Sequence, residues 1–158
     1  PGRWLGFSAD DQLAVMLGRN RQVEYHDLAA RRIVKSVPLP EDAVGALAVS
    51  DGPGLPEVLI QWRDHLEVIS AETGDSVQWL PFHRGEVRAV IWRDGYILVG
   101  DHTGGLRLWN LRSGRLRDLA SHRGPVRRLL VSPDGSLAWS SLVPSGSCRH
   151  CIQWCPDR

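Results

Sequence analysis

A short motif that occurs twice constrains the fold of this chain more than any other feature. The sequence HRGEVR at residues 83–88 returns as HRGPVR at residues 122–127. Fainter copies of the residue order around this motif begin near residues 3 and 43. We therefore expect four units, covering about residues 3–42, 43–82, 83–121 and 122–158. A repeat of this length indicates one supersecondary unit per copy, which buries its apolar surface only by stacking on its neighbours.

The apolar runs inside these units are too short for helices and have the composition of strands. Val58–Trp62 and Val87–Trp92 are typical, being rich in Val, Ile, Leu and Trp. Turn residues such as Asp94-Gly95 and Ser113-Gly114 separate the runs, and Asp-Gly pairs supply the positive φ angles that tight hairpins need. Short strands at this spacing predict an all-β fold.

The order of motifs within each unit resembles that of the WD40 family. The third unit reads His83, then Trp92-Arg93-Asp94-Gly95, then Leu106–Asn110. The fourth reads His122, then Ser132–Gly135, and ends on Trp154. The resemblance implies an incomplete β-propeller of about four antiparallel, four-stranded blades that stack radially. It also implies structural roles for four residues of the repeat, namely His83, Trp109, His122 and Trp154.

Much of the hydrogen-bonded tetrad of that family is missing here. Val99 and Thr103 stand where the third unit would have its Ser or Thr and its Asp, and Cys148 stands at the Asp position of the fourth. His26 and Ile69 replace the Trp of the first two units. We therefore expect packing, more than this network, to hold the repeats together.

The two ends of the sequence lead to a hypothesis about the whole protein. The chain starts in an expected innermost strand, Arg3–Phe7, and stops soon after an expected third strand, Cys151–Cys155. We interpret it as the closing part of a larger propeller; the alternative is a small protein that completes its ring by oligomerising. Its arginine-rich repeats also resemble the C-terminal sensor propellers of large multidomain proteins, of the telomerase- and vault-associated or nucleotide-binding-oligomerisation type.

Composition excludes several classes of protein. The formal net charge of +1 indicates no particular partner, although Lys35 is the only lysine among 19 basic residues. No apolar run approaches the roughly 18 residues of a membrane-spanning helix, and residues 1–30 lack the pattern of a secretory signal. Three cysteines, all between residues 148 and 155, do not make a disulfide framework. These features predict an intracellular protein, cytoplasmic or nuclear.

The cysteine-rich end offers a weak candidate metal site. Cys148, His150 and Cys151 are residue types that suit zinc. Cys155 lies four residues beyond Cys151 on the same expected strand, roughly 13 Å away at the usual rise per residue, so one ion cannot bind both. We expect buried thiols in place of a metal, and no cofactor.

The remaining histidines and loops carry no catalytic pattern. His65 and His102 are expected in solvated hairpin turns, and Gly104-Gly105 in a turn that is not a phosphate-binding loop. The sequence contains no nucleophile elbow and no carboxylate pair on an expected common face. We predict no catalytic residue, no enzymatic activity and no small-molecule substrate.

Arginines form the best candidate binding surface. Five of them lie at or just after the loops that enter the third and fourth units, on one face of a propeller: Arg84, Arg88, Arg123, Arg127 and Arg128. Either they are simply solvated, or they bind an acidic peptide or an RNA backbone. Trp92 and Trp139 would add base stacking if exposed, but their strand patterns favour the core. The insertion at Val143–Ser147 is a further contact candidate.

These observations predict a non-enzymatic scaffold or sensor module that binds other proteins, or the remaining blades of its own propeller. An RNA-binding surface built from the arginines is the alternative. A membrane partner is not expected.

Overall fold

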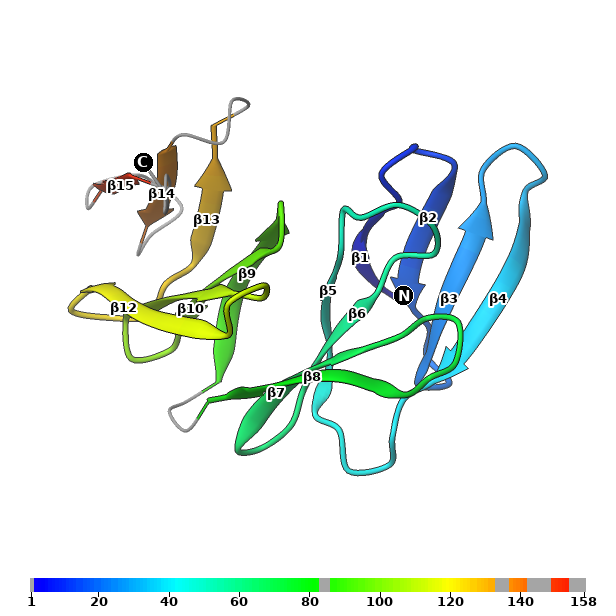
Figure 1. The fold of residues 1–158 in the computed structure, drawn as a ribbon, viewed down its shortest axis with the longest axis horizontal. Helices are drawn as coiled ribbons and strands as arrows, with labels where there is room; N and C mark the ends of the chain where they lie inside the picture. The colour runs from blue at the N-terminus through cyan, green and yellow to red at the C-terminus, as the bar shows by residue number, and fades with distance from the viewer. Residues whose placement is uncertain (1, 83–85, 133–136, 142–148, 154–158) are drawn as a thin grey trace. The chain divides into compact units, whose positions relative to one another are not determined.

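The computed structural model describes residues 2–82, 86–132, 137–141 and 149–153. Every regular element in that part of the chain is a β-strand, and the strands form four antiparallel sheets. Each sheet is a meander, in which consecutive strands are hydrogen-bonded neighbours (Figure 1). The all-β, antiparallel prediction is confirmed. Among the described residues, no helix has the length and apolar character needed to cross a membrane.

The chain divides into two compact units. The first comprises Pro1–His83 together with Trp92–Asp94, and the second comprises Arg84–Ile91 together with Gly95–Arg158. The first unit holds two four-stranded sheets. Their strands are β1 (Arg3–Phe7), β2 (Leu13–Leu17), β3 (Gln22–Asp27) and β4 (Arg32–Pro38), then β5 (Gly45–Val49), β6 (Val58–Gln61), β7 (His65–Ile69) and β8 (Ser76–Pro81).

The other two sheets follow in the chain. Their strands are β9 (Val87–Arg93), β10 (Tyr96–Asp101), β11 (Gly105–Asn110) and β12 (Arg115–Ser121), then β13 (Arg128–Val131), β14 (Leu137–Ser141) and β15 (Arg149–Gln153). The strand expected at Cys151–Cys155 therefore begins two residues earlier, at Arg149, and Cys155 lies outside the described residues. Each sheet falls within one of the four expected repeat intervals.

The first two sheets have the same local irregularities, although their sequences match only faintly. A bulge sets Leu5 out of register in β1, and another sets Leu47 out of register in β5. A buried serine directly follows each of these strands. Ser8 Oγ accepts a hydrogen bond from Leu13 N, and Ser50 Oγ accepts one from Glu57 N, both at 2.9 Å. Repeated bulges and caps indicate that the two segments fold as copies of one unit.

Apolar faces of the two sheets of the first unit enclose its core. The fully buried side chains come from strands β2, β3, β5 and β6: Val15, Val23, Tyr25, Ala46, Val58 and Ile60. Strands β1 and β5 lie side by side, and a Cβ on Gly6 would come within 2.7 Å of Val49 Cγ2. Glycine is needed in β1 because no side chain fits this close approach.

In the second unit, a smaller core joins the sheet β9–β12 to the sheet β13–β15. Its buried members are Leu98, Leu106, Leu108, Val126, Leu129 and Ala138. The β9–β10 turn has positive φ at both Asp94 (52°) and Gly95 (76°), as the sequence predicts. This is the geometry of the tight two-residue hairpin.

Candidate functional site

A buried carboxylate organises the turn that joins β10 to β11. Asp101 is the last residue of β10 and is fully buried. Its Oδ1 accepts hydrogen bonds from Thr103 N (2.8 Å), Thr103 Oγ1 (2.6 Å) and Gly105 N (2.9 Å). An Asp followed by small turn residues folds in this way because its carboxylate satisfies the backbone N–H groups that a turn leaves open. We call residues 101–105 the Asp101 turn.

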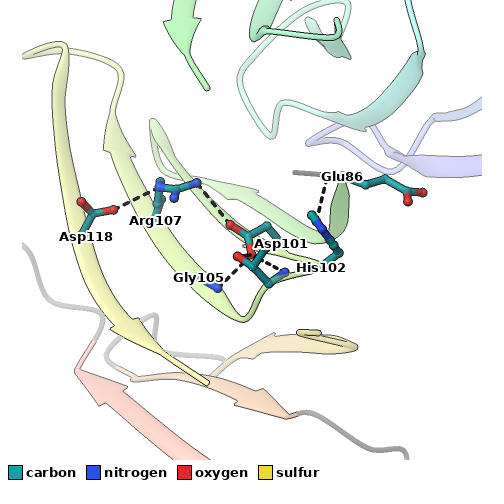
Figure 2. Close-up of polar contacts among 7 residues, drawn as sticks. Glu86, Asp101, His102, Gly105, Arg107 and Asp118 are labelled. Carbon is teal, nitrogen blue, oxygen red and sulfur yellow. Dashed lines mark hydrogen bonds and ion pairs between the residues drawn. The ribbon is translucent and has the colours of Figure 1, made fainter. Parts of the chain in front are cut away.

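Arginine 107 neutralises this carboxylate. Its Nη1 donates to Asp101 Oδ2 at 3.3 Å, and its Nε donates to Asp118 Oδ1 on β12 at 3.0 Å. In Figure 2 the Arg107 side chain lies between the two carboxylates. A buried charge without such a partner would cost several kcal/mol. The contact with Arg107 therefore compensates the Asp101 carboxylate for the loss of its hydration in the protein interior.

The Asp101 turn anchors the loop that enters β9. The backbone N–H of His102 donates to the carbonyl oxygen of Glu86 at 3.0 Å. In return, the N–H of Glu86 donates to Nδ1 of the His102 imidazole at 3.1 Å (Figure 2). His102 is exposed, as expected for a turn, but its ring acts as a hydrogen-bond acceptor that fixes this loop.

The same turn anchors the loop that enters β13. Val126 N donates to the Asp101 carbonyl at 3.0 Å, and His122 N donates to the Gly104 carbonyl at 2.8 Å. Arg127 N bonds the carbonyl of Ser141 at 2.8 Å. Residues 122–127 are thus held at both ends by backbone hydrogen bonds, and we call them the 122–127 loop.

Two glycines allow these close approaches. Gly104 has φ +99°, and a Cβ there would lie 2.3 Å from the carbonyl oxygen of His122. A Cβ on Gly100 would lie 2.4 Å from Cγ1 of Val126. Both distances are far below van der Waals contact, so the 122–127 loop sits where only glycine permits it.

His122 has a second contact that the sequence analysis missed. Its Nε2 lies 2.8 Å from the hydroxyl Oγ of Ser140 on β14, and both side chains are buried. Trp109, the other expected structural residue that is described, is buried in β11. His83 and Trp154 lie outside the described residues.

Three of the candidate arginines follow one another closely in the chain. Arg123 lies in the 122–127 loop, Arg127 ends it, and Arg128 begins β13; all three are exposed. None of the three has an ion pair with a described residue. We call them the arginine surface.

The other two candidate arginines differ from these. Arg88 is exposed on β9, but its Nη2 lies 3.1 Å from Glu86 Oε2. This ion pair weakens the attraction that Arg88 would exert on an acidic ligand. Arg84 lies outside the described residues. The loop that precedes Arg88 and the loop that carries Arg123 are both anchored on the Asp101 turn.

The cysteine-rich end of the chain is described only in part. Cys148 and the insertion at residues 143–147 lie outside them. The backbone of His150 and Cys151 is described, within β15, opposite Ser140 and Trp139 of β14. Within the described part of the chain no three His, Cys, Asp or Glu residues cluster as metal ligands would.

Two single-residue predictions are also resolved. Trp92 is buried, in agreement with its strand pattern. The prediction that His65 is solvated was wrong: it opens β7 and its side chain is only 17% exposed. Two indole rings contact it, those of Trp62 and Trp79, with ring centroids 5.3 and 5.4 Å from the imidazole.

The sequence pattern does not predict the roles of Asp101 and Ser140. The resemblance places the family's polar positions at Val99 and Thr103, whereas the carboxylate that bonds Thr103 belongs to Asp101, two residues before Thr103. An Asp-x-Thr-x-Gly order is the available signal for such a turn. Ser140 had no local signal, because its partner is 18 residues away in sequence.

Comparison with known proteins gives a fold but no family. No family model matches the chain, and no curated protein matches it. The crystal structure of the computationally designed Ika4 protein superposes with a TM-score of 0.70, at 14% identity, over 95% of this chain and 90% of that one. The designed Ika8 protein gives a TM-score of 0.66 at 18% identity, over 88% of this chain and 42% of that one. The chain therefore shares its fold with designed proteins.

Proposed function

We propose that this chain is a non-enzymatic interaction module, an incomplete WD40-like propeller of about four blades that binds acidic segments of other proteins. One meander sheet per repeat of about 40 residues supports the propeller interpretation. The three cysteines lie within residues 148–155 and do not make a disulfide framework, which favours a reducing compartment, cytoplasmic or nuclear. We further propose that the chain serves as a scaffold or sensor within a larger protein.

The arginine surface carries this proposal. Arg123, Arg127 and Arg128 are exposed and have no carboxylate partner among the described residues. The backbone that presents them is fixed by the Asp101 turn, so little conformational freedom is lost when a ligand binds. Planar guanidinium groups bind carboxylates with two parallel hydrogen bonds. An acidic peptide is therefore a fitting ligand.

An apolar neighbour favours protein over nucleic acid. Leu130 on β13 is 54% exposed, and it lies on the same face of the strand as Arg128, because side chains alternate along a strand. A peptide with acidic and apolar residues would contact both side chains. Sequence-independent RNA binding commonly adds exposed aromatic rings, whereas Trp92 is buried and Trp139, opposite Leu130, is half-buried.

RNA binding remains a second candidate because phosphates also suit unpaired guanidinium groups. Two probes separate the candidates: a peptide of alternating Glu and Leu, and a poly-uridine RNA. Fluorescence anisotropy would be measured with the full chain and with the R123A/R127A/R128A variant. The R112A/R115A/R117A variant loses the same charge from exposed positions elsewhere in the second unit.

Our proposal predicts that the arginine-surface variant binds the peptide about tenfold more weakly, with the control variant unchanged. Equal losses in both variants would mean only non-specific attraction. If RNA binds with a steep salt dependence and the peptide does not bind, the second candidate replaces the first. Binding of neither probe would contradict both.

A further inference from the structure

The first unit contains an open hollow between the β4–β5 connection and the β6–β7 turn. Its volume is about 730 Å³, within the range of ligand-binding sites. The residues that line it combine carboxylates with apolar groups: Glu41, Asp42, Ala43, Val44, Trp62, Arg63 and Asp64. The arginine surface belongs to the other unit, so this hollow is a separate feature.

One wall of the hollow is held rigidly by Arg21. Its Nη2 donates to the carbonyl oxygens of Pro40 (3.1 Å), Glu41 (3.3 Å) and Ala43 (2.8 Å). Val44 N donates to the carbonyl of Gln61 at 2.7 Å, which ties this wall to β6. These bonds use backbone carbonyls and leave the side chains of the wall available.

An oriented indole forms the other wall. Trp62 Nε1 donates to Glu67 Oε2 at 2.8 Å, which sets the direction of the ring. The His65 imidazole stacks on the ring, with centroids 5.3 Å apart and planes 11° from parallel. His65 covers one face of the half-buried Trp62 ring, and the ring also packs against the core of the unit. The rest of the indole lines the hollow.

The charge of the lining is negative. Glu41 and Asp42 are exposed, and neither carboxylate has an ion pair with a described residue. Asp64 Oδ1 lies 2.7 Å from His65 Nδ1. Against these three carboxylates stand one lining cation, Arg63, and the Arg21 guanidinium, which is bonded to the backbone of the wall.

We infer that this hollow binds an arginine side chain of a basic peptide segment. The guanidinium contacts the part of the Trp62 indole that lines the hollow, and indole is a favourable partner for cations. The carboxylates of Glu41 and Asp42 face its positive charge, and the exposed Val44 covers part of the aliphatic stem. An acidic ligand would be repelled here, so the two units would take ligands of opposite charge.

The test uses a small probe and its neutral isostere on the full chain. Acetyl-Gly-Arg-Gly-amide and the same peptide with citrulline in place of Arg would be titrated while the Trp62 indole N–H is followed by NMR. The arginine peptide should give saturable shifts below about 10 mM. Citrulline has the same shape without charge, so its affinity should be at least about threefold lower.

Variants locate the binding. The E41Q/D42N double variant keeps the shape of the hollow and should lower affinity for the arginine peptide by about threefold or more. The matched control, E72Q/E57Q, removes the same charge from side chains of the first unit that do not line the hollow. Absence of saturation, equal binding of citrulline, or equal losses in both variants would overturn the inference. None of these results bears on the acidic-peptide proposal, which concerns other residues.

Discussion

The imidazole of His122 and the hydroxyl of Ser140 form a buried hydrogen bond, 2.8 Å from Nε2 to Oγ. It joins the 122–127 loop, which carries Arg123, to β14 in the sheet β13–β15. Four anchoring contacts fix this loop, one through side chains and three through the backbone bonds of His122, Val126 and Arg127. The position of Arg123 and Arg127 therefore depends on residues outside the arginine surface.

The S140A variant should be destabilised. Removing the hydroxyl leaves a buried imidazole nitrogen without its partner, which costs about 1–3 kcal/mol. Urea unfolding followed by amide resonances of the second unit would measure the loss. The control is S121A, because Ser121 is exposed and its change should cost less than about 0.5 kcal/mol. Equal effects of the two substitutions would contradict the role given to Ser140.

Two glycines with positive φ give a sharper comparison. G104A introduces a Cβ 2.3 Å from a carbonyl oxygen, whereas G114A, also at positive φ (67°), meets no atom within 4 Å. We expect G114A to cost about 1–2 kcal/mol through backbone strain alone. G104A should cost at least twice as much, because the 122–127 loop must also move. Thermal unfolding would measure both, and similar losses would show that the loop adapts freely.

The two ion pairs of Arg107 should contribute unequally to the free energy of unfolding. Asp101 is buried, whereas the Asp118 side chain is 82% exposed. D101N removes a buried partner and hydrogen-bond acceptor, so we expect a loss of about 3 kcal/mol. D118N should cost less than about 1 kcal/mol, since solvent screens an exposed pair. Chemical denaturation of the two variants checks the order, which a larger loss in D118N would contradict.

D101N should also weaken the acidic-peptide binding proposed above. The variant loosens the turn on which the 122–127 loop is anchored, and greater disorder of a binding loop lowers affinity. Hydrogen exchange at the Val126 and His122 amides would report the loosening directly. Faster exchange without any change in affinity would separate the anchor from the binding surface.

Some of this structure follows from local sequence, and the rest does not. The Asp94-Gly95 turn is predictable because its conformation depends on the two residues that form it. The strand Arg3–Phe7, expected from the order of motifs in the repeat, is observed at the predicted bounds. His65 was misassigned because its cover comes from Trp79, a partner on another strand. The Asp101 anchors and the His122–Ser140 bond are likewise long-range contacts, about which periodicity carries no information.

Alkaline pH should destabilise the first unit through Tyr25. Its ring lies in the core and its hydroxyl donates to the Pro56 carbonyl at 2.8 Å. Burial raises the pKa of Tyr25 above the ordinary value of 10.0, because the phenolate would lose its hydration. The unfolded chain then releases this proton before the folded one does. The contribution of Tyr25 to the free energy of unfolding is therefore fully present below about pH 10 and falls as the pH rises further.

The Y25F variant isolates that effect. At neutral pH it should be less stable than the parent by about 1 kcal/mol, because the Pro56 carbonyl loses its donor. Above about pH 10 the parent chain loses stability through Tyr25 and the variant does not, so the difference between them should shrink. Urea unfolding of both proteins at about pH 7, 9 and 11 measures this convergence. Parallel stability curves across the whole range would show that Tyr25 ionises equally easily in the folded and unfolded chain.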